Sequence, residues 1–295
     1  MAVRRGTTAR VRLLRGPVAV VSLVAGAAFV AAAWATLIDP RRTVVRQRTL
    51  RLPGWPADLD GLRLALVGDL HAGAAHVDAE RVERLAAAIA RRRPDAVLFA
   101  GDLMDDESVG ADRLRPATIA AALAGAGAPR FAVLGNHDRT FGARTVRRAL
   151  IGAGFSVLEN ASEPVDARGR RAWIAGVADD DSATPRPDAA LAGVPDGEPV
   201  VVLTHSPDVF PRIPERVALT VAGHTHGGQV AVPGPLRARV IPSRFGDRYA
   251  RGHIVEAGRH LFVTSGVGTS RWPIRFGIPS EVVLLKLRAR RGAGR

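Results

Sequence analysis

Side chains that can bind metal ions gather in five short motifs, and each motif follows a run of apolar residues. Five of the chain's eight histidines stand in these motifs, together with aspartate and asparagine residues. The motifs are Gly68-Asp69-Leu70-His71, Gly101-Asp102, Gly135-Asn136-His137-Asp138, Thr204-His205-Ser206 and Gly223-His224-Thr225-His226. Histidines scattered at random would not gather at the ends of apolar segments, so the pattern indicates a metal-dependent hydrolase.

The donor atoms in these motifs are carboxylate oxygens, imidazole nitrogens and an amide oxygen, and the chain has no cysteine. Such a set suits manganese, iron or zinc rather than a structural zinc site built from thiolates. Two ions that share a carboxylate would use more donors than one ion can, and hydrolytic enzymes hold such pairs about 3.5–4 Å apart. We therefore expect two divalent ions. The candidate ligands are Asp69, His71, Asp102, Asn136, His205, His224 and His226.

The elements that must position these residues are predicted by the apolar runs before them. Short continuous apolar runs bounded by glycine and polar residues are typical of buried strands, and the lack of alternation indicates that both sheet faces are covered. Ligands at the carboxyl ends of such strands lie where open α/β sheets place their sites. The predicted strands are 62–67, 96–100, 131–134, 200–203 and 218–222, and the predicted helices are 78–91, 114–123 and 145–150.

Taken in order, the motifs D-x-H, G-D, G-N-H-D, H and G-H-x-H resemble the signature of the calcineurin-like metallophosphoesterase superfamily. The resemblance covers roughly residues 61–287, and every position of the signature is present. It implies an α/β fold in which a two-sheet β-sandwich is flanked by helices on both sides. It also implies hydrolysis of a phosphate ester, in which water activated by the two ions attacks phosphorus.

The resemblance also implies a role for each residue of the signature. His137 would be the acid that protonates the leaving oxygen, and Asp138 would orient His137. The remaining positions would bind metal: Asp69, His71 and His226 the first ion, Asn136, His205 and His224 the second, and Asp102 both.

A finer resemblance is to a bacterial branch of the superfamily that carries an N-terminal membrane segment. Residues 205–210, residues 226–230 with Pro233, and residues 266–281 around Arg275 carry this resemblance. One position departs from the branch, because Gly68 stands where serine usually precedes the first aspartate. Gly68 is not a ligand, so metal binding is not expected to suffer. The resemblance implies an N-terminus inside the cytoplasm and a catalytic domain outside it.

Several polar residues outside the signature could also serve the site. Asp105 and Asp106 either orient metal ligands or belong to a solvated loop. Arg271 and Arg275 could clamp a substrate phosphate as forked donors, although the simpler expectation is that both are surface arginines. No site is expected at the remaining histidines, His76, His253 and His260, or at Asp179-Asp180-Asp181, which is predicted to be an exposed loop.

The net charge of +14 is concentrated at the two ends of the chain. Residues 1–60 carry ten arginines against three acidic residues, and residues 286–295 carry five basic residues and no acidic one. The core from 61 to 285 holds 27 arginines against 25 acidic residues. A nuclease would spread basic residues along its catalytic face, so a nucleic-acid substrate is not expected. Basic ends suit contact with anionic lipid headgroups.

Residues 17–38 contain no charged side chain and are long enough to cross a bilayer with some tilt. Five arginines lie on each side, so charge does not set the orientation. Two interpretations are open: an uncleaved anchor, which the length favours, or a signal peptide cleaved after Ala33 or Ala35. The expected division is a basic segment at 1–16, the membrane helix at 17–38, a linker at 39–60, the catalytic domain at 61–287 and a basic tail at 288–295.

The sequence as a whole predicts a membrane-anchored phosphoesterase that acts on phosphodiesters more than on phosphomonoesters. The anchor favours a lipid or another cell-envelope component as the phosphate-ester substrate. A different class also fits, namely a metal-stabilised interaction domain that is tethered to the membrane and lacks catalysis. The presence of both His137 and Asp102 favours the enzyme.

Overall fold

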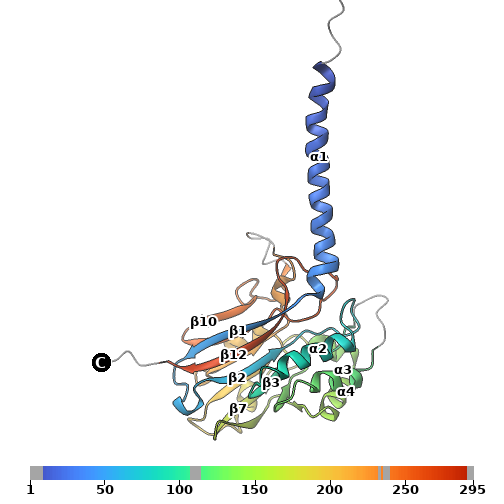
Figure 1. Ribbon diagram of the computed structural model, residues 1–295. Helices are drawn as coiled ribbons and strands as arrows, with labels where there is room; N and C mark the ends of the chain where they lie inside the picture. The colour runs from blue at the N-terminus through green and yellow to red at the C-terminus, as the bar shows by residue number, and fades with distance from the viewer. Residues whose placement is uncertain (1–8, 107–113, 232–233, 235–239, 291–295) are drawn as a thin grey trace, which may run out of the picture.

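The computed structural model describes residues 9–106, 114–231, 234 and 240–290, and in these residues two six-stranded sheets pack against each other (Figure 1). The first sheet has the order β1-β12-β2-β3-β4-β5. Its strands are β1 (Thr43–Leu52), β2 (Leu62–Val67), β3 (Ala96–Phe99), β4 (Arg130–Ala132), β5 (Ser156–Val157) and β12 (Ser280–Ala289). The second sheet has the order β10-β11-β9-β8-β7-β6. Its strands are β6 (Ala161–Ala167), β7 (Arg170–Val177), β8 (Val200–Thr204), β9 (Leu219–Ala222), β10 (Gly252–Glu256) and β11 (Arg259–Val263).

Parallel pairing dominates the middle of both sheets. Strands β2 to β5 pair in parallel, as do β7, β8, β9 and β11. Antiparallel pairs join β12 to β2, β6 to β7 and β10 to β11. Because parallel neighbours end at the same edge of a sheet, the loops after β2, β3 and β4 meet at one edge, and the loops after β8 and β9 meet likewise.

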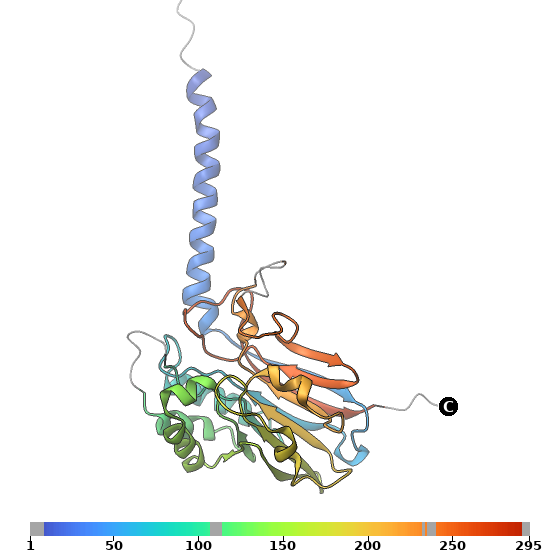
Figure 2. The ribbon, with the colours of Figure 1, turned by 180° about the vertical axis from the view of Figure 1, so that it is seen from behind.

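Apolar residues fill three layers of this sandwich. The layer between the sheets includes Leu64, Leu98, Val201 and Val221, all fully buried. Three helices, α2 (Ala79–Ala90), α3 (Pro116–Ala124) and α4 (Asn136–Gly152), cover the outer face of the first sheet. The short helix α5 (Pro187–Leu191) and the 3-10 turn η4 (Pro207–Arg212) cover the second sheet, which Figure 2 shows from behind. The predicted sandwich flanked by helices on both sides is confirmed.

The five predicted strands are present as β2, β3, β4, β8 and β9. The helix predicted at 78–91 is α2, and the side chain of Asp78 caps it by accepting a hydrogen bond from the Arg81 backbone nitrogen at 2.8 Å. The helix predicted at 145–150 is longer, because α4 begins at Asn136 and bends at Gly142, whose φ is 138°. The third motif therefore opens a helix instead of forming only a turn.

The prediction of a linker at 39–60 is wrong for most of its length. Residues 43–52 form β1, which pairs in parallel with β12 along the whole strand. Trp55 and Leu59, which follow β1, are buried against the same core. The basic tail also begins later than predicted, because Arg288 still belongs to β12 and donates to the Asp60 carboxylate. The pairing was hidden because the partner strand lies at the opposite end of the chain.

Replacing the buried Leu52 with alanine should lower the free energy of unfolding by roughly 2–5 kcal/mol, because it leaves a cavity under β1. The matched control is Thr49→Ala on the exposed side of the same strand, which should change stability by less than about 0.5 kcal/mol. Urea unfolding followed by circular dichroism measures both. Equal, small effects of the two substitutions would show that residues 43–52 act as a tether and not as a strand.

The N-terminal helix stands apart from the sandwich (Figures 1 and 2). Helix α1 (Ala9–Ala33) continues through a π-helical turn, η1 (Trp34–Ile38), into a 3-10 turn, η2 (Asp39–Arg41). Its stretch Ala19–Arg41 is long and apolar enough to cross a membrane, and the residues of this stretch before Ala35 are exposed or half-buried. One helix near the N-terminus is therefore a candidate membrane span.

Candidate metal centre

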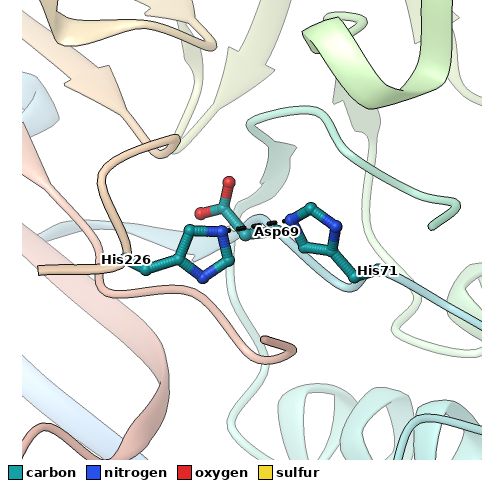
Figure 3. A group of neighbouring side chains, drawn as sticks. All are labelled: Asp69, His71 and His226. Carbon is teal, nitrogen blue, oxygen red and sulfur yellow. Dashed lines mark hydrogen bonds between the residues drawn. The ribbon is translucent and has the colours of Figure 1, made fainter. Parts of the chain in front are cut away.

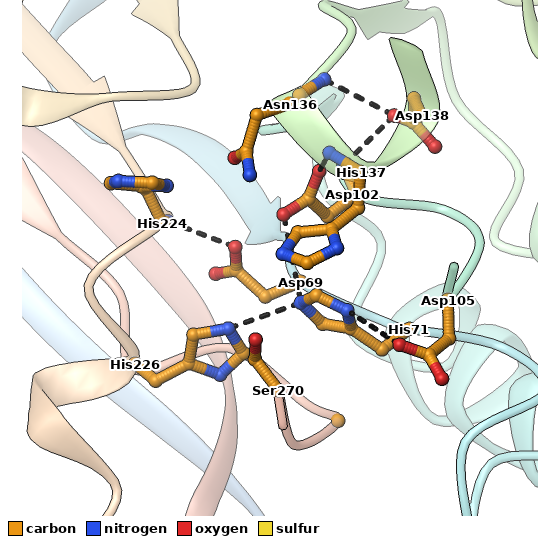
Figure 4. A network of polar contacts seen from close by, with 12 residues as sticks. Asp69, His71, Asp102, Asp105, Asn136, His137, Asp138, His224, His226 and Ser270 are labelled. Carbon is orange, nitrogen blue, oxygen red and sulfur yellow. Dashed lines mark hydrogen bonds and ion pairs between the residues drawn. The ribbon is translucent and has the colours of Figure 1, made fainter. Parts of the chain in front are cut away.

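All five motifs meet at one edge of the sandwich, where the loops after β2, β3, β4, β8 and β9 converge. Figure 4 labels residues from four of these motifs, all but the one that carries His205. The side chains come from both sheets. His71 of the first sheet lies 3.1 Å from His226 of the second, measured between their Nε2 atoms. The centre is thus formed between the two sheets and depends on how they pack.

A first group of donors consists of Asp69, His71 and His226, which are buried and have ligand atoms within 4.8 Å of one another (Figure 3). The Nε2 atoms of the two histidines face each other. Imidazole nitrogens bind zinc-like ions at about 2.0–2.1 Å, so two nitrogens at this separation can both reach one ion.

A second group of donors surrounds the Nε2 atom of His205. The Asn136 Oδ1 atom lies 3.0 Å from it and the His224 Nδ1 atom 3.1 Å from it. The other ring nitrogen of His205, Nδ1, lies 2.7 Å from the Ala100 carbonyl oxygen and donates to it, which directs Nε2 toward the other two donors. His205 and His224 are buried, and Asn136 is half-buried.

The carboxylate of Asp102 lies between the two groups. Its Oδ2 atom is 3.5 Å from His71 Nε2 and 3.2 Å from His205 Nε2. Its Oδ1 atom accepts a hydrogen bond of 3.0 Å from the His137 backbone nitrogen, which fixes the orientation of the carboxylate. Burial would raise the pKa of Asp102, but the neighbouring His205, His71 and His137 hold that pKa below its usual range. Asp102 is therefore an anion placed to serve both groups.

One observation besides the spacing of the donors also indicates that these residues can bind divalent cations. The Oδ2 atom of Asp69 is buried and accepts no hydrogen bond from any described residue. Burial raises the pKa of Asp69, because water no longer stabilises its charge. A buried carboxylate oxygen without a protein donor is costly unless a cation or a water binds it. A cation there would satisfy the oxygen.

The backbone at the candidate ligands adopts the left-handed region, which residues with a Cβ atom rarely enter. Such strain persists only where surrounding structure enforces it, and it clusters at functional sites. Five of the seven candidates have positive φ: Asp69 (51°), His71 (46°), Asp102 (55°), His224 (69°) and His226 (49°). Close packing adds to this, since a Cβ atom at Gly135 would lie 2.1 Å from Asp102 Oδ1. The left-handed backbone at these residues directs their side chains toward one point.

His137 reaches the centre from the first turn of α4 (Figure 4). Its ring meets that of His71 edge-on, with centroids 4.7 Å apart, and its Nδ1 atom forms a hydrogen bond with the Asp106 carboxylate. The expectation that Asp138 orients the His137 ring is wrong. Asp138 accepts backbone hydrogen bonds from Asp102, Leu103 and Gly135 instead, and it thereby fixes the loop that carries Asp102.

The profile of the calcineurin-like phosphoesterase family matches residues 62–255, which contain the whole centre. The chain belongs to this family. Among its relatives is the uncharacterized metallophosphoesterase YkuE of Bacillus subtilis, 25% identical over 93% of this chain and 94% of YkuE. Phosphodiesterase YaeI of Escherichia coli is 32% identical over 66% of this chain and 71% of YaeI. The UDP-2,3-diacylglucosamine pyrophosphatase LpxG of Chlamydia trachomatis is 25% identical over 86% of this chain and 92% of LpxG.

Arg275 occupies a place in this metallophosphoesterase that its sequence context did not predict. It is fully buried, so the expectation of a surface arginine is wrong, and its guanidinium donates to the carbonyl oxygens of Gly268, Ile278 and Ser265. Its Nη2 atom also lies 3.3 Å from His226 Nδ1. With its donors occupied in this way, Arg275 supports the loop behind the centre and is not available as a substrate clamp. Arg271 is exposed.

The acidic triplet after β7 is the group that the sequence interpretation missed. Asp179 is fully buried, so the prediction of an exposed loop is wrong there. Asp181 is more exposed, and its Oδ2 atom lies 3.1 Å from His224 Nε2. The hydrogen bond with His224 lowers the pKa of Asp181. The five motifs were identified as metal-binding side chains that follow an apolar run. The triplet has the same pattern, since it closely follows the apolar strand β7, which lies parallel to β8.

Electrostatics divides the histidines of the centre into two kinds. Burial opposes protonation of His205, but the charge of Asp102 raises the pKa of His205 well above its usual value. Burial, His71 and Arg275 together hold the pKa of His226 well below its usual value. His226 is therefore neutral and ready to donate a lone pair, whereas metal binding must displace a proton from His205.

Two of the remaining acidic residues contact histidines of the centre, whereas two of the remaining histidines contact each other. Asp105 is buried with its Oδ1 atom 3.7 Å from His71 Nδ1, and the exposed Asp106 contacts His137, so both carboxylates lie against histidines of the centre. His253 and His260 hydrogen-bond to each other on the β10–β11 hairpin. Pro233, which the finer resemblance included, lies outside the described residues.

Proposed function

We propose that this family member is a membrane-anchored phosphodiesterase with a centre of two divalent ions. The observation that carries the proposal is the arrangement of the donors. Two buried groups, centred on His71 and His205, lie on either side of the Asp102 carboxylate. A fifth histidine, His137, enters the centre from a helix and has a carboxylate partner of its own.

The proposed ligands follow these two groups. Bound ions would activate water and neutralise charge on the phosphate oxygens. Asp102 would contribute to both sites because its Oδ2 atom faces both histidine groups. The first ion would be held by Asp69, His71 and His226, and the second by Asn136, His205 and His224.

His137 would supply the proton that the leaving oxygen needs. Hydrolysis replaces the bond from phosphorus to the ester oxygen with a bond from phosphorus to a water oxygen, and the departing alkoxide must be protonated. The Asp106 carboxylate contacts His137 Nδ1, which orients the ring and leaves Nε2 as the proton-donating atom. Arg271, exposed next to Ser270 beside the centre, is proposed to contact the substrate phosphate.

Two further observations support a diester substrate at the membrane. The relative YaeI is a phosphodiesterase, and the relative LpxG is a pyrophosphatase of UDP-2,3-diacylglucosamine. The apolar stretch Ala19–Arg41 supports anchoring of the chain in a bilayer. We place the catalytic domain on the extracytoplasmic side, as in the bacterial branch that the sequence resembles.

The full-length protein in nanodiscs, loaded with Mn²⁺, should hydrolyse an aryl phosphodiester faster than the corresponding aryl phosphomonoester. Chelator should abolish both rates, because the centre provides the activation of water. Release of nitrophenolate measures the rates, and elemental analysis measures bound metal. A protein that binds two ions and turns over neither ester would contradict the proposed function.

A further inference from the structure

The base of α1 is fixed to the catalytic domain and does not act as a hinge. The backbone nitrogen of Arg275 donates to the Ala35 carbonyl oxygen at 2.9 Å, and that of Gly277 donates to Asp39 Oδ2 at 3.1 Å. Arg81 of α2 donates to the Pro40 carbonyl oxygen at 2.8 Å, and Ala35, Asp39 and Pro40 are all buried. The direction of α1 therefore sets how the domain is oriented relative to a bilayer.

The same segment that holds α1 also borders the metal centre. The side-chain amide of Gln229 accepts a hydrogen bond from the Ser270 backbone nitrogen at 2.8 Å and donates one to the Ser270 carbonyl oxygen at 3.0 Å. Ser270 lies beside the histidines of the centre (Figure 4), and the guanidinium of Arg275 lies 3.3 Å from His226 Nδ1. One short stretch, residues 270–277, thus joins the end of the candidate span to the centre.

Large apolar side chains on this stretch point into solvent. Trp272 is 69% exposed and Phe276 is 41% exposed. At the adjoining end of α1, Trp34 is 38% exposed and Ile38 is 43% exposed. Figures 1 and 2 both show the segment that precedes β12 at the base of α1. Tryptophan concentrates where membranes meet water, because its ring is apolar and its N–H can still be hydrated.

An open apolar groove continues from this surface along the helix. It runs along one face of α1 from Ser22 to Trp34 and ends at Phe276. The residues between them are small or aliphatic, among them Gly26, Ala27 and Val30. In a chain anchored by α1, this groove lies inside the bilayer, where hydrocarbon chains are the available occupant. Trp34 and Phe276 connect it to the stretch that borders the centre.

We propose that Trp34, Trp272 and Phe276 insert into the headgroup boundary of the bilayer and hold the centre against the membrane surface. The substrate is then a lipid phosphodiester that enters from the bilayer, with an alkyl chain in the groove along α1 and its phosphate at the centre. This assignment rests on the proposed function, because it requires the centre to hydrolyse diesters.

Membrane contact of Trp272 is tested by fluorescence in nanodiscs that contain brominated phosphatidylcholine, which quenches nearby tryptophan. The full-length protein is compared with Trp272→Phe. The wild-type protein should lose more fluorescence than the variant, and the difference reports Trp272 alone. If quenching removed the same amount of fluorescence from both proteins, the proposal would be overturned.

Substrate entry from the bilayer is tested with two phosphodiesters that share one leaving group, methyl 4-nitrophenyl phosphate and hexadecyl 4-nitrophenyl phosphate. The wild-type protein should prefer the hexadecyl ester. Trp272→Ser and Phe276→Ser should each reduce that preference by roughly tenfold, through a misplaced substrate, while the methyl ester rate stays unchanged. The matched control is Ile151→Ser, since Ile151 is also an exposed apolar residue, at 51% against 41% for Phe276, but lies at the far end of α4.

The outcomes separate this proposal from the proposed function. Failure of the wild-type protein to hydrolyse either ester would remove the phosphodiesterase itself, whatever the quenching shows. Hydrolysis of both esters at equal rates would overturn only entry from the bilayer. Equal loss of both rates in the Trp272 and Phe276 variants would also overturn it, because it would indicate general damage to the loop.

Discussion

Replacing Asp102 with alanine is expected to produce a protein that binds neither ion and has no measurable phosphodiesterase activity. The reason is the position of the carboxylate, whose Oδ2 atom faces His71 at 3.5 Å and His205 at 3.2 Å. Each proposed ion site loses its shared anion at once. Without that anion, the buried space between the two histidine groups has less negative charge to stabilise a cation, which weakens metal binding further.

Metal content and thermal stability measure this effect together. The wild-type protein should melt at a higher temperature with Mn²⁺ than with chelator, because a ligand that binds only the folded state stabilises it. Asp102→Ala should show the same melting temperature in both. Asp102→Asn is a second variant that retains an acceptor for the His137 backbone nitrogen, and Asp166→Asn is a control on an exposed side chain. Two ions per chain in Asp102→Ala would refute the bridging position.

The parts of the fold that sequence predicts are those with a local signal. The strands before the five motifs are short, largely apolar runs, and glycine follows four of them, so a few residues are enough to recognise each. β1 has no such signal, because arginine and glutamine interrupt its apolar residues and its partner β12 is distant in sequence. Its assignment depends on two buried leucines, Leu50 and Leu52, whose burial arises only when the sheet forms.

The candidate site divides in the same way. The donors at strand ends can be identified because the sequence gives both the residue type and its place directly after an apolar run. The roles of neighbouring residues were not, because they depend on which side chain meets which after folding. Asp106, and not Asp138, contacts His137, although both lie close to a motif. Arg275 is buried because backbone carbonyls of its own loop surround it, and no sequence pattern records such an enclosure.

Replacing His137 with alanine is expected to leave both ions bound and to slow hydrolysis of an alkyl phosphodiester by about 10²–10⁴-fold, the usual contribution of a general acid. An aryl ester with a nitrophenolate leaving group should slow much less, since nitrophenolate departs without a proton. Comparing the two substrates in one variant therefore isolates proton donation from substrate binding. Elemental analysis confirms that the metal content is unchanged.

Asp106 and Asp138 provide the matched comparison for this assignment. Asp106→Asn removes the charge that faces His137 and should reproduce the same leaving-group dependence in weaker form. Asp138→Asn removes an acceptor of several backbone hydrogen bonds and should instead lower metal affinity and slow both esters alike, because the loop that carries Asp102 loses its support. If His137→Ala slowed alkyl and aryl esters equally, proton donation would be excluded, and the histidine would belong with the residues that shape the centre.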